Sequence, residues 1–344
     1  MIIVISVISV NFKYTGSFAD SNNSSYVVIE KLSGRVLYEY NSNKKAYMAS
    51  TTKILTAITV IDNFDISREV TVPKSCVGVE GSSVYLNEND VFTVEDLLYG
   101  LMLRSGNDCA EALAITLSGS IEDFASLMNQ TAIRCGATNS NFKNPHGLHD
   151  DNHYTTAYDL ALITRYALKN SVFAKIASTK NYVATEKNSN VSRYWINKNK
   201  MLSSFEGATG VKTGFTKKAG RCLVSSAQKN GMELICVVLN EPNHYQMSKN
   251  LLTKGFDNYR LIKIIDANKF DYSLPTENRT EYYDLEVKDD FYYPVSNGES
   301  ISAEIALPKY LPSSVKSGEK VGEIKIYASK QLIFLQNIYT LINN

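Results

Sequence analysis

A serine and a lysine three residues apart, Ser50 and Lys53, are a pair that could do chemistry together. They stand at the start of an apolar run with helical periodicity, and residues i and i+3 of a helix lie on one face. A serine hydroxyl becomes an effective nucleophile when a neighbour takes its proton, and a lysine can do so when burial or positive charge lowers its pKa. The pair is therefore a candidate for nucleophilic catalysis, but by itself the spacing favours an ordinary helix start with a solvated lysine, and the motifs downstream decide between the two.

Two more motifs follow along the chain. Ser105-Gly106-Asn107 interrupts two apolar helical stretches, where a turn would present two hydrogen-bonding side chains beside a core. Lys212-Thr213-Gly214 precedes two strand-like runs joined at Asn230-Gly231, so it is expected on or beside the edge strand of an antiparallel sheet. Gly214 would let an extended substrate lie against that strand, with charge and hydroxyl supplied by its neighbours. Each motif alone also fits a plain turn or a solvated strand end.

Three of the four histidines, His146, His149 and His153, gather in one region beside two aspartates. Their spacing around proline and glycine lacks the helical His-x-x-x-His face that favours a metal. A hydrogen-bonded loop bordering a cleft is the better interpretation, and we expect no metal and no cofactor.

Five cysteines are widely spaced and include no Cys-x-x-Cys pair. The odd number argues against a complete disulfide framework. Cys109, Cys222 and Cys236 lie in apolar runs, so they are expected to be buried small hydrophobic residues rather than nucleophiles.

The composition is typical of a soluble globular protein of about two domains, with 344 residues, 44% of them hydrophobic and 21% charged. A net charge of +1 gives no reason to expect nucleic acid or an anionic membrane surface as a partner.

The first ten residues are almost all aliphatic and too few to span a bilayer as a helix. They resemble the apolar core of a secretory signal, and Ser17-Phe18-Ala19 offers a cleavage site, although no basic residue precedes Lys13. We predict a signal peptide over residues 1–19 and an extracytoplasmic location, secreted or at the outer face of the membrane; the alternative is a buried first strand. Residues 331–342 are expected to form a last strand rather than an anchor, so only an uncleaved N-terminal segment would attach the protein to a membrane.

Periodicity and turn residues predict a strand hairpin over 26–40 and helices over 50–61, 93–103, 110–117, 121–135, 156–168 and 248–264. After residue 265 prolines become frequent and the pattern is one of short strands, among them a strand-turn-strand over 315–327. We predict a catalytic domain over residues 20–264 and a β-rich domain over 265–344.

The three motifs occur in an order known from penicillin-binding proteins and class A β-lactamases, with Gly106 where the middle motif commonly has aspartate. The sequence resembles the low-molecular-weight penicillin-binding proteins that are serine-type D-alanyl-D-alanine carboxypeptidases. Stretches 96–103, 144–148, 153–161 and 210–220 extend the resemblance over most of the chain. It implies an α/β (α+β) catalytic domain of the serine β-lactamase/transpeptidase type, with an antiparallel sheet flanked by helices, and a small all-β C-terminal domain.

The resemblance also implies a mechanism on peptidoglycan stem peptides that end in D-Ala-D-Ala. Ser50 would attack the penultimate carbonyl while Lys53 takes its proton, and water would then hydrolyse the acyl-enzyme. Ser105 would relay a proton to the leaving amine, and Asn107 would orient the substrate amide. β-Lactams, which mimic the substrate, would acylate the same serine.

Substrate binding is implied for a second group of residues. Lys212 and Thr213 of the Lys-Thr-Gly motif, which ends with Gly214, would hold the terminal carboxylate. Backbone N–H groups of Ser50 and Phe215 would form the oxyanion hole, and Lys198 stands where relatives often carry a basic residue near the substrate.

Two rival functions have distinct signatures. A class A β-lactamase on the same fold needs a glutamate to activate the deacylating water, and residues 139–158 contain none. A catalytically silent cell-wall binding protein would have a defective motif, and all three motifs are intact.

Overall fold

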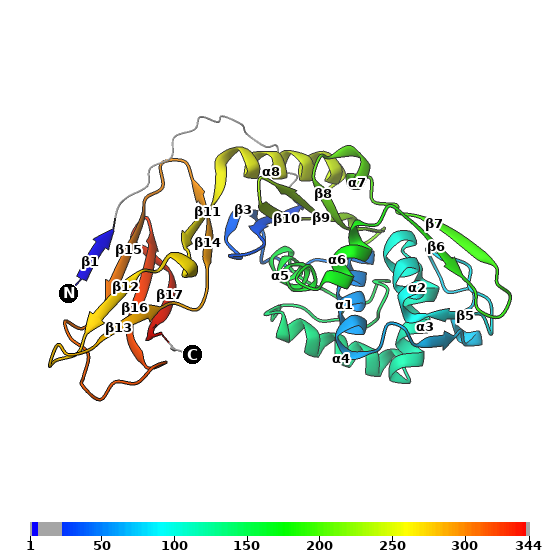
Figure 1. Cartoon of the computed structure of the whole chain (residues 1–344). Helices are drawn as coiled ribbons and strands as arrows, with labels where there is room; N and C mark the ends of the chain where they lie inside the picture. The colour runs from blue at the N-terminus through cyan, green and yellow to red at the C-terminus, as the bar shows by residue number, and fades with distance from the viewer. Residues whose placement is uncertain (1, 6–22, 342–344) are drawn as a thin grey trace. The chain divides into compact units, whose positions relative to one another are not determined.

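The computed structural model describes residues 2–5 and 23–341, and these separate into two compact units (Figure 1). One unit is formed by residues 23–256 and the other by residues 257–341 together with strand β1 (Ile2–Ile5). Apart from β1, the predicted signal peptide lies outside the described residues. The division after Phe256 falls within a helix, and the domain limits given above stay a prediction.

The larger unit is built around an antiparallel sheet of five strands. Their order across the sheet is β3 (Val36–Tyr40), β2 (Ser25–Glu30), β10 (Met232–Leu239), β9 (Gly220–Lys229) and β8 (Ala208–Thr216). The predicted hairpin over 26–40 is confirmed by β2 and β3. Strands β9 and β10 meet at Asn230 and Gly231, whose φ angles of 49° and 79° suit a tight hairpin turn. As predicted, the Lys-Thr-Gly motif lies on the edge strand, β8.

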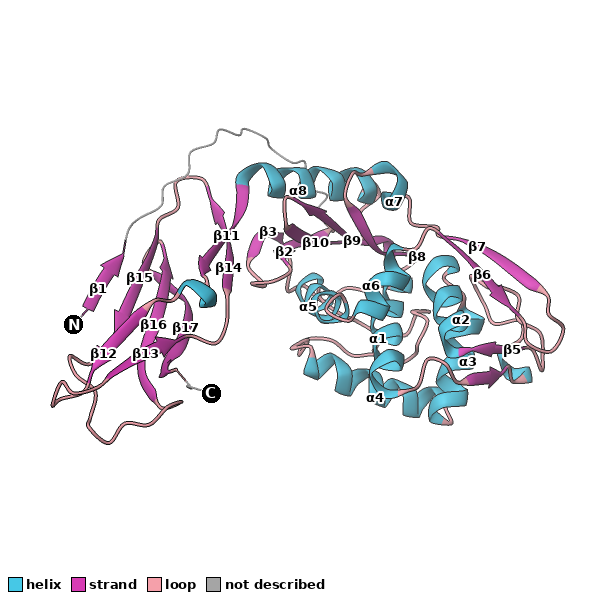
Figure 2. Cartoon of the chain, in the orientation of Figure 1, coloured by secondary structure: helices cyan, strands magenta, loops and turns pink. Residues whose placement is uncertain are grey.

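Helices cover both faces of this sheet (Figure 2). Helix α8 packs on one face, where its Ser248 hydroxyl contacts that of Ser225 in β9, while α1, α5 and α6 lie on the other. Val27, Ile58, Leu160 and Val237 meet in the core between them. The helices are α1 (Lys53–Asn63), α2 (Val94–Tyr99), α3 (Asn107–Ser118), α4 (Ile121–Arg134), α5 (Ala157–Ala167), α6 (Ser171–Ser178), α7 (Met201–Ser204) and α8 (His244–Asn258).

Two short strand pairs complete the larger unit, β4 (Glu69–Thr71) with β5 (Val91–Thr93) and β6 (Asn181–Thr185) with β7 (Ser192–Ile196). All five cysteines are free, and Cys109, Cys222 and Cys236 are buried as predicted.

One predicted helix is wrong in its second half. The helix expected over 248–264 ends at Asn258, and residues Tyr259–Ile265 form strand β11, which pairs with β14. The sequence from Tyr259 to Ile265 contains three isoleucines, whose branched side chains favour an extended chain. The helix expected over 110–117 begins earlier, at Asn107.

The smaller unit is almost entirely β-structure. Five of its strands and β1 form a sheet in the order β1, β15, β16, β17, β13 and β12, and β11 pairs with β14 in a separate ribbon. The predicted last strand is confirmed by β17, whereas residues 315–319 form no strand because β16 begins at Lys320. The strands are β11 (Tyr259–Ile265), β12 (Tyr272–Pro275), β13 (Tyr282–Glu286), β14 (Phe291–Ser296), β15 (Ile301–Ala306), β16 (Lys320–Ala328) and β17 (Gln331–Thr340). In the part of the chain described here, no helix has both the length and the apolar character needed to cross a membrane.

Candidate active site

Ser50 lies in a single 3₁₀ turn, η1 (Ala49–Thr52), and Lys53 is the first residue of helix α1. In a 3₁₀ turn the side chains of residues i and i+3 eclipse each other, which brings this pair closer than a straight α-helix would. Lys53 Nζ is 3.2 Å from Ser50 Oγ. The predicted meeting of the two side chains is therefore confirmed.

Lys53 is fully buried, and its ammonium group has two further partners. Nζ donates to Asn107 Oδ1 and to the His146 carbonyl oxygen, both at 2.7 Å. Burial, followed by the charge of Lys212, holds the pKa of Lys53 well below its usual value. A neutral amine has two N–H bonds and one lone pair. If both hydrogens of a neutral Lys53 are directed at these two acceptors, its lone pair faces Ser50, as a general base requires.

The Ser-Gly-Asn motif lies where the chain leaves one helix and enters the next. Helix α2 continues into a π-turn, Gly100–Arg104, and Ser105 ends it in the left-handed conformation with φ of 64°. Helix α3 then begins at Asn107. The Ser105 side chain is nearly buried, and no described residue hydrogen-bonds its Oγ, so the hydroxyl can still bind a substrate atom.

The side-chain amide of Asn107 has a fixed orientation. Nδ2 donates to the Glu80 carbonyl at 2.6 Å, and this contact turns Oδ1 toward Lys53. The backbone N–H of Asn107 donates to the Ser82 carbonyl at 2.7 Å. The loop that contains Glu80 and Ser82 therefore belongs to the site, although its sequence predicts only a loop.

Edge strand β8 packs directly against η1, the turn of the candidate nucleophile Ser50, which we call the nucleophile turn. A Cβ atom added to Gly214 would lie 2.9 Å from the Met48 carbonyl oxygen and 3.1 Å from the backbone nitrogens of Ser50 and Thr51. The absence of a side chain at Gly214 is what lets the strand and the turn come together. Phe215 follows with its side chain 61% exposed and with the Arg221 guanidinium over its ring.

The basic residues of the site repel one another. Lys212 is buried, its Nζ donates to the Thr213 carbonyl at 3.1 Å, and burial together with Lys198 lowers its pKa to about 7. Lys198 donates to Ser82 Oγ at 3.3 Å, and burial and Arg104 lower its pKa. Lys198, Lys212 and Arg104 form no ion pair with any carboxylate of the described residues. Such a cluster is suited to receive an anionic group.

Two loop residues that the sequence did not assign to catalysis hold the nucleophile turn in place. Gly147, with φ of 87°, lies so close to the turn that a Cβ atom there would fall 1.9 Å from the Ala49 carbonyl oxygen. His153 Nδ1 accepts the Lys143 N–H, so its Nε2–H donates to Thr52 Oγ1 at 2.8 Å. Burial lowers the pKa of His153 to about 3, and the ring is therefore neutral.

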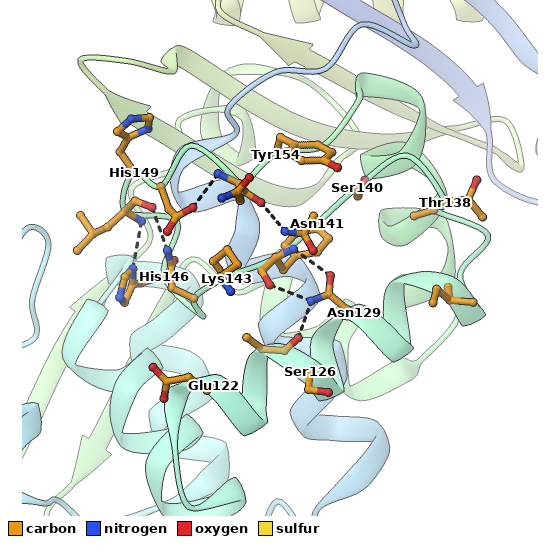
Figure 3. Close-up of a pocket in the computed structure, with 18 residues that line it drawn as sticks. Glu122, Ser126, Asn129, Thr138, Ser140, Asn141, Lys143, His146, His149 and Tyr154 are labelled. Atoms are coloured by element: carbon orange, nitrogen blue, oxygen red, sulfur yellow. Dashed lines mark hydrogen bonds between the residues drawn. The ribbon is translucent and has the colours of Figure 1, made fainter.

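A cavity of about 1170 Å³ lies between helix α4 and residues 137–154 (Figure 3). Neither Ser50 nor Lys53 lines it. Asn129 on α4 bonds the backbone N–H and carbonyl of Phe142 across its wall (Figure 3). Asn144 bonds the backbone N–H of Gly147 and the carbonyl of Leu148. These bonds fix the loop that brings the His146 carbonyl to Lys53.

Comparison with known proteins agrees with this geometry. Residues 13–243 match the family described as D-alanyl-D-alanine carboxypeptidase, and residues 260–343 match the C-terminal domain of penicillin-binding protein 5. The D-alanyl-D-alanine carboxypeptidase DacF of Bacillus subtilis is 29% identical over 326 residues, which cover 91% of this chain and 83% of the relative. DacA of Haemophilus influenzae is 32% identical, with 88% and 77% covered.

Solved structures show the same fold. Penicillin-binding protein 5 of Haemophilus influenzae superposes with a TM-score of 0.79 at 28% identity, covering 95% of this chain and 98% of that one. A mutant of the Streptomyces K15 DD-transpeptidase gives a TM-score of 0.64 at 32% identity, covering 67% of this chain and 96% of that one. With a nucleophile turn, a buried lysine and a Lys-Thr-Gly edge strand in one place, this chain belongs to the D-alanyl-D-alanine carboxypeptidase family of serine peptidases, within the penicillin-binding proteins.

Proposed function

We propose that this protein removes the terminal D-alanine from peptidoglycan stem peptides ending in D-Ala-D-Ala, through an acyl-enzyme on Ser50. The observation that carries the proposal is the bonding of Lys53. Its Nζ contacts Ser50 Oγ while two acceptors, Asn107 Oδ1 and the His146 carbonyl, occupy its hydrogens.

In the acylation step Ser50 Oγ attacks the carbonyl carbon of the penultimate D-alanine, and the hydroxyl proton passes to Lys53. The peptide C–N bond then breaks as Ser105 Oγ relays a proton to the leaving nitrogen, and D-alanine departs. Asn107 orients the substrate amide. In the second step water attacks the ester carbonyl and gives a proton to Lys53; the acyl C–O bond breaks, and Lys53 returns the proton to Ser50 Oγ as the shortened peptide leaves with a new carboxyl group.

The substrate's terminal carboxylate is placed by the basic side of the site. Lys212 and Thr213 on β8 bind it, and Lys198 adds positive charge near Ser82. The backbone N–H groups of Ser50 and Phe215 form the oxyanion hole. The close approach of Gly214 to the nucleophile turn supports this pairing, because it places the two N–H groups on adjoining segments.

Penicillins present a strained amide and a carboxylate to the same groups, so they acylate Ser50. Residues 139–158 hold no glutamate that could activate a deacylating water, and rapid turnover of penicillin is therefore not expected.

The substrate lies outside the cytoplasm, and the protein is extracytoplasmic. We propose in addition that residues 1–19 are an export signal, that an uncleaved signal would tether the protein, and that the peptidase activity resides in residues 20–264 with 265–344 as a separate β-rich domain.

The test combines product detection with mapping of the acylated residue. Wild-type protein should release free D-alanine from a D-Ala-D-Ala peptide, and penicillin treatment followed by mass spectrometry should place the adduct on Ser50. Ser50→Ala should lose both signals, while Ser126→Ala, a change on an exposed face of α4, should keep both. An adduct on another residue, or release of D-alanine by Ser50→Ala, would refute the assignment.

A further inference from the structure

Asp108, the residue after the Ser-Gly-Asn motif, is a carboxylate that is 1% exposed and forms no ion pair with a described residue. Oδ2 accepts from Ser83 Oγ at 2.6 Å, from Val84 N at 3.0 Å and from Leu86 N at 3.1 Å. Oδ1 accepts from Cys109 N at 3.0 Å. One buried side chain thus binds three groups of a single loop.

That loop supplies direct partners of the catalytic residues. Its Ser82 carbonyl accepts the Asn107 N–H at 2.7 Å, and its Ser82 hydroxyl meets Lys198. The backbone carbonyl of Glu80, in the same loop, accepts from Asn107 Nδ2. A Cβ atom on Gly81 would lie 2.8 Å from that same nitrogen, so the loop and Asn107 are in close contact.

The carboxylate also explains the glycine in the middle motif. A Cβ atom on Gly106 would lie 2.7 Å from Asp108 Oδ1, 3.1 Å from Cys109 Sγ and 3.3 Å from Val84 Cγ1. A side chain at Gly106 would therefore collide with the carboxylate in the position it needs to reach the loop. The glycine at position 106 therefore leaves the space that the Asp108 carboxylate needs to bind the loop.

We propose that Asp108 is a positioning residue for acylation. It holds the loop over residues 80–86 so that the Glu80 carbonyl orients the Asn107 amide, which in turn directs the Lys53 lone pair at Ser50. This inference rests on the proposed function of those three residues. Asp108 itself touches neither Ser50 Oγ nor Lys53 Nζ, and it acts only through the loop.

Asp108→Ala and Asp108→Asn test the inference. The rate of acylation by a fluorescent penicillin is measured per active serine, with the final amount of label giving the number of active serines. We expect a 10- to 100-fold lower rate for Asp108→Ala, because small misplacements of reacting groups have effects of this size. Asp108→Asn keeps one acceptor oxygen and should recover part of the rate. Hydrogen exchange at the Val84 and Leu86 amides should be faster in both variants.

Asp96→Asn is a matched control, since Asp96 is also a buried carboxylate of this unit and accepts from Thr93 and Tyr182 away from the loop. It should acylate at the wild-type rate per active serine. The inference would be overturned if Asp108→Ala contained fewer active molecules but acylated at the wild-type rate per active serine. It would also be overturned if Asp96→Asn lowered the acylation rate as much as Asp108→Ala does. If Asp108→Ala fails to fold, Asp108→Asn decides by the same criteria. Absence of acylation in the wild type would instead refute the proposed function.

Discussion

Replacing Gly214 by alanine probes the contact on which the proposed oxyanion hole depends. The added methyl would lie 2.9 Å from the Met48 carbonyl oxygen, whereas non-bonded heavy atoms rest at about 3.5 Å or more. Strand β8 and the nucleophile turn would have to separate by about 0.6 Å, and both are backbone, so no side chain can rotate away. The separation would pull the N–H of Phe215 out of line with that of Ser50.

The expected result is a large loss of rate with a moderate loss of stability. Removing one oxyanion-hole donor lowers kcat by about 10²–10³-fold, and a donor displaced by a fraction of an ångström should lower it by about 10- to 100-fold. Overpacking destabilises a core by about 1–3 kcal/mol, and alanine offsets part of that by restricting the unfolded chain. Acylation by fluorescent penicillin and release of D-alanine measure the first effect, and urea unfolding measures the second.

Gly255→Ala serves as the control. Its added methyl would lie 2.5 Å from Leu234 Cδ1, but this atom is the end of a side chain that can move. Gly255→Ala should lose stability without losing acylation rate. Should Gly214→Ala acylate as fast as the wild type, the β8 strand would have no part in holding the reacting carbonyl, and the argument from backbone contact would fail.

Three more predictions concern charge. Lys212→Met removes a positive neighbour of Lys53, so the pKa of Lys53 should rise and the pH at which acylation becomes fast should move upward; a profile of acylation rate against pH that stays in place would contradict the coupling. Lys198→Ala should raise KM for the D-Ala-D-Ala peptide about tenfold with a smaller change in kcat, and should weaken the salt dependence of kcat/KM. His153 has a pKa of about 3 in the folded state against 6.5 normally, so the unfolded state binds its proton first on acidification. Stability should therefore fall by about 2 kcal/mol more between pH 7 and pH 5 in the wild type than in His153→Gln, as urea unfolding at the two pH values would show.

Local sequence patterns were enough to predict much of the large unit. The Asn230-Gly231 turn and its flanking apolar runs predicted the hairpin of β9 and β10. The helix predicted from residue 93 corresponds to the start of α2, where Thr93 and Asp96 form a capping box. The strand after Asn258 was mistaken for helix because its pattern of apolar and polar residues fits both periods. Residues 259–265 form a strand because they pair with β14, and the local sequence does not show which segment a strand will pair with.

Within the site, residue type and order along the chain identified Ser50, Lys53 and Asn107 as groups with complementary chemistry. Their contact, however, depends on groups that carry no signal in a sequence. The His146 carbonyl and the Glu80 carbonyl are backbone atoms, identical in every residue, and only folding brings them to Lys53 and Asn107.

What the sequence determined by itself, then, is which chemical groups are available and which of them share a helix start or a strand edge, because these follow from spacing and side-chain type. What only the tertiary structure decided is the pKa of these groups and the direction in which they form hydrogen bonds. The lowered pKa of Lys53 arises from burial and from Lys212, which stands far away along the chain. The Asn107 amide is oriented by a loop that Asp108 anchors. Desolvation and hydrogen-bond direction depend on every element packed around a group, and so they exist only once the chain has folded.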